Sequence, residues 1–358
     1  MIDRDSKATN DRTWCFWSNV NFPIDDIVTK QWNKVYFKGE QGVFGGQLGR
    51  QGYRLVRSAD FYQKIKQNLA LNPYIHWKNA TILDLEEKDG QSFVHTDKGS
   101  FSASYIFNSC YQKSEQEPDY HHLLQHFKGW FIQTEKPVFN SEEMVLMDFR
   151  IAQNGVAKFM YILPFSKTEA LVEYTLFSES LESPSNYNNV LENYITEFLG
   201  AQAYTVLEEE FGVIPMTDQP FQSNISPNIL NIGTLSGAVK PTTGYAFTRI
   251  LQQTEQIVKQ LEKGGPINTS IKTKSRLKFY DKLLLNILQH EGGEAHKIFN
   301  HLFKHNNLNL ILRFLEEKSS LWQEMKIFST LPAWPFLKAI YRTQFKKSKN
   351  GVSVPATI

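Results

Sequence analysis

The sequence predicts a two-domain α/β chain that has an antiparallel sheet in its middle and a helical C-terminal part. At 358 residues it is more than twice the usual length of one domain. Short alternating and β-branched runs dominate up to about residue 177, and helical spacing follows them. Hydrophobic residues make up 41% and charged residues 21%, so the chain is an ordinary globular protein rather than a disordered one.

Strands are expected first. Met1 to Asp3 has the pattern of the end of a strand. Residues 75–85 and 91–108 form short apolar runs broken by Asp89-Gly90 and Lys98-Gly99, which predicts hairpins. Three more strands are predicted at 144–152, 158–164 and 169–177. Asn154-Gly155 and Ser166-Lys167 separate them and favour antiparallel pairing.

Helices are expected from residue 190 onward. An apolar face over 190–198 ends at Gly200, and a second helix is predicted to begin at Gly244 and to stop before Gly264-Gly265. The remainder has little strand character. Short helices are predicted at 283–288, 298–303, 308–315 and 321–328.

Charge and composition exclude several classes of function. Lys and Arg total 39 against 37 Asp and Glu, a net charge of +2, so nucleic acid is not expected as a partner. Cys15 and Cys110 lie in no metal or redox motif, which predicts buried free thiols in a reducing cytoplasm. The sequence contains no apolar run of about eighteen residues, so a membrane-spanning helix is not predicted. Aromatic residues form 13% of the chain. They either fill a large core or line a site for a large apolar ligand.

The segment most informative about function runs from Asn231 to Arg249. An apolar strand ends at Gly233, a loop carries Gly237, Pro241, Thr242 and Thr243, and a helix follows near Gly244-Tyr245. Small residues let a ligand approach the backbone, and unpaired amides at a helix start attract anions such as a phosphate or an anionic ring. The alternative is an ordinary strand–loop–helix connection. Neither G-x-G-x-x-G nor G-x-x-x-x-G-K-[ST] occurs in the sequence.

This segment resembles the C-terminal cofactor motif of the lycopene cyclase family, the FAD-containing enzymes that close carotenoid rings, and is most similar to bacterial lycopene beta-cyclases. Other segments agree with that family in the same order, namely Asn10 to Trp17, Gly129 to Glu135, Leu146 to Arg150, Leu171 to Thr175 and Pro332 to Leu337. The resemblance spans residues 2 to about 340. It implies a Rossmann-type fold like that of FAD-dependent oxidoreductases.

The resemblance also implies a domain plan and a set of cofactor contacts. Residues 1–75 and 200–263 would form a partial FAD-binding domain, 76–199 a substrate sheet with strands that contact FAD, and 264–358 a helical region. Members of the family begin with a strand, a glycine turn and a helix that hold the FAD diphosphate, so the chain is expected to be N-terminally truncated or a variant, and to bind FAD poorly. Asp3 would then bond the adenosine ribose. Arg12 would contact the diphosphate, or form a surface salt bridge instead.

Two carboxyl groups are the candidate catalytic residues. Glu173 lies in an apolar strand, where a carboxyl group faces either solvent or a pocket, and the family match assigns it the essential acid. Burial would keep that carboxyl protonated near neutral pH. Asp148 would orient Glu173 or stabilise positive charge, or else bind Arg150.

The implied reaction is the cyclisation of lycopene to beta-carotene, a redox-neutral isomerisation that needs FAD in its reduced form and NAD(P)H as reductant. The alternatives are a flavin-dependent monooxygenase or dehydrogenase of similar fold, and an inactive carotenoid-binding fragment. Because carotenoids are insoluble, we expect a cytoplasmic protein that lies peripherally on the membrane. Four basic residues near the C-terminus would contact lipid headgroups or form a solvated tail, namely Arg342, Lys346, Lys347 and Lys349.

Histidines give a weaker signal. His121, His122 and His126, and also His301 with His305, have a spacing that would place them on one side of a helix. No HExxH pattern or cysteine partner accompanies them, so no metal site is predicted.

Overall fold

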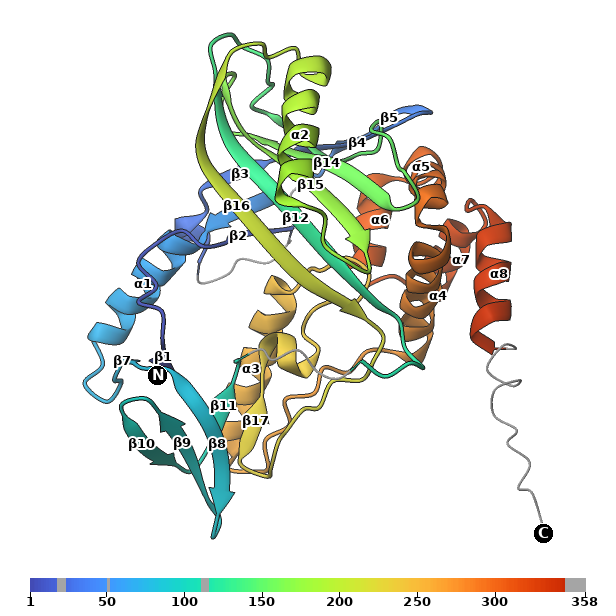
Figure 1. The fold of residues 1–358 in the computed structure, drawn as a ribbon. Helices are drawn as coiled ribbons and strands as arrows, with labels where there is room; N and C mark the ends of the chain where they lie inside the picture. Colours follow the sequence, from blue (N-terminus) through green and yellow to red (C-terminus); the bar gives the residue numbers. More distant parts are fainter. Residues whose placement is uncertain (18–23, 50–51, 111–115, 345–358) are drawn as a thin grey trace, which may run out of the picture.

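A twisted sheet of seven strands forms the centre of the molecule (Figure 1). The computed structural model describes residues 1–17, 24–49, 52–110 and 116–344. The strands follow the order β16-β12-β15-β14-β13-β4-β5 across the sheet. Their bounds, in that order, are Tyr204–Thr217, His122–Thr134, Glu169–Ser178, Ala157–Pro164, Glu143–Asp148, Lys34–Gly39 and Gly42–Gln47. Neighbours pair antiparallel except β13 and β4, which run parallel.

Apolar side chains cover both faces of this sheet, so the central strands are buried. Helix α2 (Pro184–Asn193) and the π-helical turn after it (Tyr194–Phe198) pack on one face, through a core that includes Tyr187, Leu191 and Tyr194. The opposite face packs against the helical C-terminal part and a small sheet in the order β2-β6-β3. Those three strands are Thr13–Trp17, Tyr53–Arg57 and Lys30–Trp32. Both faces being apolar explains why β14 and β15 are near-continuous hydrophobic runs.

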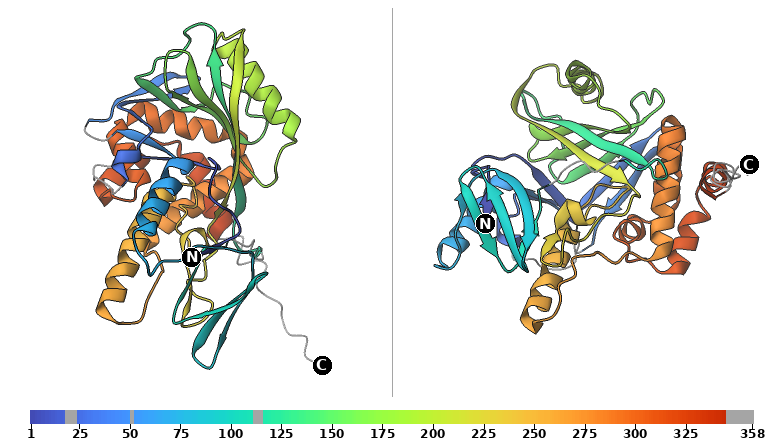
Figure 2. Two further views of the ribbon diagram at one scale, coloured as in Figure 1. Left: turned by 90° about the vertical axis from the view of Figure 1, so that its left-hand side faces the viewer. Right: turned by 60° about the horizontal axis from the view of Figure 1, so that its bottom comes forward.

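A second group of elements lies below the large sheet (Figure 2). Two parallel pairs join distant segments: β1 (Ile2–Asp3) with β7 (Lys78–Asn79), and β11 (Ile106–Asn108) with β17 (Ile229–Asn231). An antiparallel sheet of β8 (Ile82–Lys88), β9 (Gln91–Thr96) and β10 (Gly99–Ala103) lies beside them. Helices α1 (Ser58–Ala70) and α3 (Phe247–Lys263) complete this part.

The C-terminal part is helical, as predicted. Its helices are α4 (Ser275–Glu291), α5 (Ala295–His305), α6 (Leu308–Leu315), α7 (Leu321–Phe328) and α8 (Ala333–Gln344). Short 3-10 turns occur at Asp25–Ile27, Gly233–Ser236 and Gly292–Glu294. In the part of the chain that the structure describes, no helix combines the length and the hydropathy needed to cross a bilayer.

Most predicted elements are confirmed, but two long strands were missed. β12 and β16 are the longest in the sheet. β12 contains His122 and His126, and His121 comes directly before it, so these three cannot share one helical face. His126 bonds Tyr187 and Ser178, and His121 bonds Asp218. His301 and His305 do lie on a helix, α5. The second helix begins at Phe247 rather than Gly244, because Lys240 to Tyr245 closes into a turn first.

The sheets cut across the domain bounds expected from the sequence. β4 and β5, within the first 75 residues, and β16, after residue 200, all belong to the seven-stranded sheet. Strands β7 to β11, at 78–108, lie instead with β1 and β17. The expectation that both cysteine thiols are buried is wrong for Cys110, which is exposed, whereas Cys15 is partly buried.

Candidate active site

A row of four residues crosses the large sheet and brings two carboxyl groups together. In the strand register, Glu210 on β16 lies opposite Gly129 on β12, and Gly129 lies opposite Glu173 on β15. Glu173 in turn lies opposite Tyr161 on β14. Residues directly opposite each other across strands share one face of the sheet. The row therefore points toward the small sheet of β2, β6 and β3.

Gly129 lets the two carboxyl groups meet across the strand between them. A Cβ atom at this position would lie 3.2 Å from Glu210 Oε1, 3.0 Å from Glu210 Cγ and 2.8 Å from Leu171 Cδ1. The side chain of Glu210 thus occupies the space above the glycine, and it hydrogen-bonds to the carboxyl group of Glu173. Any other residue at 129 would displace one of these neighbours.

Two threonine hydroxyl groups fix the outer oxygens of this pair. Thr175 Oγ1 donates to Glu173 Oε1 over 2.6 Å, and Thr13 Oγ1 donates to Glu210 Oε2 over 2.7 Å. Thr175 is two residues along the same strand and so shares a face with Glu173. Thr13 comes from β2, so the segment from Asn10 to Trp17, called the N-terminal signature below, contacts the carboxyl pair directly.

The environment favours the protonated form of Glu173. Burial raises the pKa of its carboxyl group to about 8, and the nearby charge of Glu210 adds to the effect. Burial also raises the pKa of Glu210, while the hydrogen bonds from Thr13 and Glu173 lower it. At neutral pH the pair therefore retains a proton, and Glu173 is an acid in the range useful for proton transfer.

Hydroxyl and thiol groups surround the same face. Tyr161 donates to the hydroxyl group of Tyr53 over 2.7 Å, and Tyr53 and Tyr245 share a hydrogen bond of 3.1 Å. Burial raises the pKa of Cys15, whose thiol bonds to Tyr161. Burial raises the pKa of each of the three tyrosines as well. All these groups are neutral at physiological pH, so these neighbours of Glu173 are polar but uncharged.

The glycine loop reaches this face through Tyr245. Gly233, Gly237 and Gly244 have φ values of 61°, 80° and 69°, which are left-handed conformations that suit glycine. Tyr245 packs edge-on against Trp17, with ring centroids 4.7 Å apart, and lies close enough to Glu173 for its charge to act on the tyrosine. The loop and the N-terminal signature thus meet beside the carboxyl pair.

A buried charge cluster holds the other end of this loop. Lys240 Nζ lies 2.9 Å from Asp281 Oδ1 on α4 and 3.0 Å from Glu317 Oε1, in the turn after α6. Thr242 Oγ1 donates to the same Asp281 oxygen over 2.7 Å, and Arg249 forms an ion pair with Glu317 at 3.1 Å. The helical C-terminal part therefore determines where the loop lies.

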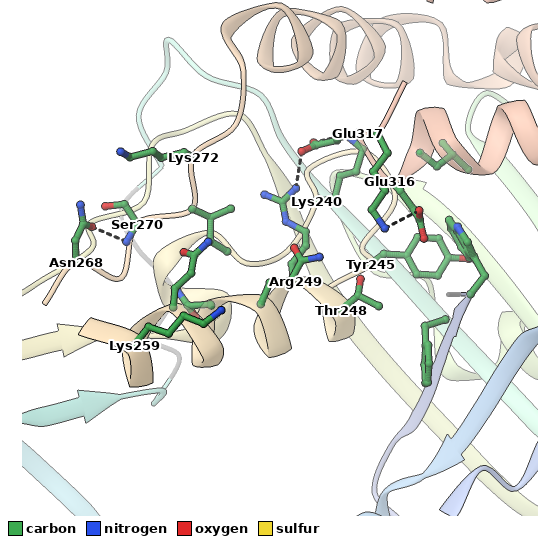
Figure 3. A pocket seen from close by; sticks show the side chains of 18 of the residues that line it. Lys240, Tyr245, Thr248, Arg249, Lys259, Asn268, Ser270, Lys272, Glu316 and Glu317 are labelled. Atoms are coloured by element: carbon green, nitrogen blue, oxygen red, sulfur yellow. Dashed lines mark hydrogen bonds and ion pairs between the residues drawn. The ribbon is translucent and has the colours of Figure 1, made fainter. Parts of the chain in front are cut away.

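A cavity of about 520 Å³ opens beside the first turns of α3 (Figure 3). Trp17 and Tyr245 line it, together with Thr248 and Arg249 of the helix. Trp17 Nε1 and Arg249 Nε are buried and find no hydrogen-bond partner among the described residues. Aromatic walls with two unpaired N–H donors suit a flat ligand that carries hydrogen-bond acceptors.

The structure separates Asp148 from Glu173. The Asp148 carboxylate accepts hydrogen bonds from Arg150 at 2.6 and 2.9 Å and from Tyr194 at 2.6 Å. Tyr194 belongs to the core on the α2 face, opposite the carboxyl pair. The contact with Arg150, which the sequence left as an alternative, is the one present.

The two N-terminal candidates lie on the surface. The side chain of Arg12 is 67% exposed and pairs with Asp11 at 3.7 Å, which is the salt bridge that the sequence left open. Asp3 accepts a hydrogen bond from the amide of Asp5 and pairs with Lys7 at 3.6 Å. Pro241 and Thr243 lie in the closed turn between Lys240 and Tyr245. Within the described part of the chain, none of these four residues forms a hydrogen bond or ion pair with Glu173 or Glu210.

Sequence reasoning missed Glu210, Gly129 and Thr13 as parts of the site. One signal was present: Glu208, Glu209 and Glu210 precede Phe211 and Gly212 in a strand, where alternate residues share a face, so at least one of the three acids had to face the core side. Which strand lay opposite could not be read from that pattern.

Comparisons with known proteins agree with these findings. The family model described as "Lycopene cyclase protein" matches residues 1–341. A neoxanthin synthase of Solanum tuberosum is 28% identical over 267 residues, which are 68% of this chain and 51% of that protein. A lycopene beta cyclase of Capsicum annuum is 24% identical over 251 residues, 66% of this chain and 46% of that protein. The chain spans about half the length of these curated relatives.

The fold is also that of flavin-dependent enzymes. The crystal structure of the halogenase PltM with phloroglucinol and FAD matches with a TM-score of 0.54 and 10% identity, over 92% of this chain and 78% of that one. Likeness at this identity concerns the fold alone, an FAD-dependent oxidoreductase-like α/β fold, as predicted. The family model covers nearly the whole chain, and this chain accordingly belongs to the lycopene cyclase family.

Proposed function

We propose that the chain is a lycopene beta-cyclase, which closes the linear ends of lycopene into beta rings without net oxidation or reduction. The observation that carries the proposal is Glu173, a buried carboxyl group with a pKa of about 8 beside neutral aromatic side chains. Protonating an alkene requires a donor that is still protonated at neutral pH, in a site that excludes water, and a buried carboxyl group with a raised pKa meets the first need. Family membership supports the same reaction.

The reaction balances without a net change in protons. Glu173 protonates the C1=C2 double bond, which leaves a tertiary cation at C1. The electrons of the C5=C6 bond attack C1 and close the ring, and loss of the proton from C6 gives the beta ring. One proton enters and one leaves. The neutral hydroxyl groups of Tyr53, Tyr161 and Tyr245 line the same face and present oxygen lone pairs to a developing cation.

The residues beside α3 fit a flavin. The cavity offers aromatic walls from Trp17 and Tyr245 and two unpaired buried N–H donors, on Trp17 and Arg249. Two residues of the loop that begins at Gly233, namely Lys240 and Tyr245, line the same cavity. When bound in its reduced, anionic form, FAD supplies negative charge that stabilises a neighbouring cation.

We propose that the residues predicted from the sequence bind FAD, and the structure supports some of them better than others. Seven come from the loop, and Tyr245 among them lines the cavity. The loop set is Gly233, Gly237, Pro241, Thr242, Thr243, Gly244 and Tyr245. Asp3 and Arg12 would contact the ribose and the diphosphate, and both side chains are partly exposed and therefore accessible. NAD(P)H is the proposed reductant.

We also propose that α7 and α8 rest on a lipid bilayer, from which the insoluble substrate enters. Trp334, Leu337 and Tyr341 have the i, i+3, i+7 spacing of one helix face and are all exposed. The opposite side of α8 packs on α4 through Ala339 and its neighbours, so the helix is apolar on both sides. α7 presents a similar exposed set, namely Leu321, Trp322 and Met325. Exposed tryptophans beside aliphatic residues suit a membrane interface.

Basic residues contribute less to this surface than the sequence suggested. Arg342 forms an ion pair with Glu291 at 2.7 Å, and Lys338 pairs with the same carboxylate at 2.6 Å. Lys346, Lys347 and Lys349 lie outside the described residues. The apolar side chains of α7 and α8 therefore support the membrane proposal better than charge does.

Product analysis tests the proposed reaction. The chain is expressed in cells that accumulate lycopene, and the carotenoids are separated by chromatography. We expect beta rings from the wild type and none from Glu173→Gln, which keeps the shape of the side chain but removes its proton. Glu169→Gln changes an acid on the same strand and face and serves as the control, with activity retained. Oxidised products would support a monooxygenase or dehydrogenase instead.

A further inference from the structure

We propose that Glu173 and Glu210 act as one proton-holding pair, in which Glu210 is a positioning residue that sets how tightly Glu173 holds its proton. The inference deepens the proposed function and rests on it for its catalytic meaning. Its basis is the geometry of the sheet: the two side chains come from strands on either side of β12 and meet over Gly129.

Electrostatic repulsion between the two carboxylates favours a shared proton. Two carboxylates in hydrogen-bond contact repel each other strongly when both are ionised, so the pair keeps one proton over a wide pH range. Aspartic proteases use two carboxyl groups in this way. Here Glu173 is the deeper of the two, since its side chain is buried while Glu210 is partly exposed. The proton is therefore held mainly on Glu173.

Two threonine hydroxyl groups orient the carboxyl groups. Thr175 donates to one oxygen of Glu173, and Thr13 donates to one oxygen of Glu210. A carboxylate oxygen that accepts a hydroxyl hydrogen is a poor place for the shared proton. Glu210 Oε1, the oxygen that Thr13 does not bind, lies over the glycine and is available for the hydrogen bond with Glu173. The two threonines thus fix the pair in the arrangement that shares one proton.

Few charges act on Glu173 besides that of Glu210. Glu210 is the leading charge that acts on Glu173. Glu210 itself is influenced by Glu208 and Arg57, which form an ion pair with each other. The other titratable groups on this face are neutral at physiological pH, namely Cys15, Tyr53, Tyr161 and Tyr245. The charge of Glu210 is consequently the main adjustable influence on Glu173.

The pair suits a reaction that takes up one proton and releases another. When Glu173 gives its proton to the alkene, two adjacent anions remain, and their repulsion makes the pair a strong base. The proton lost from C6 then returns to the pair, which restores its starting state. Glu210 keeps Glu173 protonated before the first step and favours the return of the proton in the second. It acts through Glu173 and need not touch the substrate.

Infrared titration of the purified chain tests the pair without any substrate. The absorption of protonated carboxyl groups is followed from about pH 5 to about pH 10 in the wild type, Glu173→Gln, Glu210→Gln and Glu209→Gln. The wild type should show one carboxyl group that titrates near the pKa of about 8 of Glu173. This carboxyl group should be missing from Glu173→Gln. Glu210→Gln should lower its midpoint by about one pH unit or more, because the repelling charge is gone. Glu209 lies on the opposite face and pairs with Lys128, so Glu209→Gln is the matched control.

Circular dichroism confirms that each variant is folded, and the isosteric Gln leaves the packing over Gly129 unchanged. An unchanged midpoint in folded Glu210→Gln would overturn the proposal. The outcomes stay separate from those of the proposed function. A lowered midpoint supports the pair even if no beta ring forms in cells, whereas an unchanged midpoint rejects the pair even if beta rings do form.

Discussion

Lys240 Nζ lies 2.9 Å from Asp281 Oδ1, and this buried ion pair joins the glycine loop to helix α4. The two residues are distant in sequence, and both side chains are nearly inaccessible to solvent. Glu317 and Thr242 complete the hydrogen bonds, so neither charge is left unpaired. The helical C-terminal part therefore positions the loop that carries Tyr245, which lies near the carboxyl pair.

Breaking this pair should destabilise the protein. Asp281→Asn removes a charge that two donors share and leaves Lys240 with Glu317 alone. We expect a loss of about 2 kcal/mol in the free energy of unfolding, below the full cost of an unpaired buried charge because Glu317 remains. Urea denaturation measures it. Glu255→Gln, which removes an exposed partner of Lys259, should change stability by less than about 0.5 kcal/mol. Equal effects in the two variants would contradict the role of Asp281.

A side chain at position 129 should force the carboxyl groups apart. In Gly129→Ala the new Cβ would lie 2.8 Å from Leu171 Cδ1 and 3.0 Å from Glu210 Cγ, so one of them must move. We expect a destabilisation of about 1 to 3 kcal/mol together with a lower titration midpoint for Glu173. Gly265→Ala meets no atom within 4 Å and is the matched control. A Gly129→Ala protein with unchanged stability and midpoint would show that the glycine is not needed.

The raised pKa of Glu173 predicts a pH-dependent cost to stability. The unfolded carboxyl group titrates near 4.5 and the folded one near 8, so between these values the folded state binds more protons than the unfolded state. Stability contributed by this group is present below the unfolded value and is lost as pH rises toward the folded value. Glu173→Gln should therefore match the wild type near pH 4.5 and exceed it by roughly 4 to 5 kcal/mol near pH 9.

Denaturant unfolding at both pH values measures this difference. The isosteric Glu169→Gln, on the same strand, corrects for changes elsewhere in the sheet. If Glu173→Gln were no more stable than the wild type at the higher pH, the carboxyl group would not be held protonated by its surroundings.

The exposed apolar sides of α7 and α8 should govern attachment to lipid. Trp322 and Trp334 are 79% and 67% exposed, and replacing both with Ser should lower binding to vesicles by about tenfold or more. The matched control replaces Leu71 and Tyr74, which are 85% and 89% exposed beyond the end of α1, with Ser. Flotation with phosphatidylcholine vesicles provides the measurement. Equal losses from both double variants would mean that the two helices are not the contact surface.

Local pattern was sufficient for much of this molecule. The apolar runs at β14 and β15, the helices of the C-terminal part and the strand–loop–helix around Gly233 follow from periodicity and turn residues, which act over a few neighbours. Glu173 was found in the same way, as a carboxyl group inside an apolar strand, with the family resemblance giving it a role.

Local pattern does not predict the face of the sheet on which Asp148 lies. Met144 and Leu146 face the carboxyl side of the sheet, and strict alternation would place Asp148 there as well. A register shift between Val145 and Asp148 turns the last residue to the α2 face instead. Such a bulge depends on how two strands fit together and leaves no dependable mark in either sequence.

The sequence by itself determined most of the helices and many of the strands, though not β12 and β16, and it determined that an acid lies in an apolar strand, because these properties depend on neighbouring side chains. Only the tertiary structure decided that Glu173 meets Glu210 over Gly129, and that Lys240 is held by Asp281. Both contacts join segments distant in the chain, and they are selected by strand register and by the cost of leaving a buried charge without a partner.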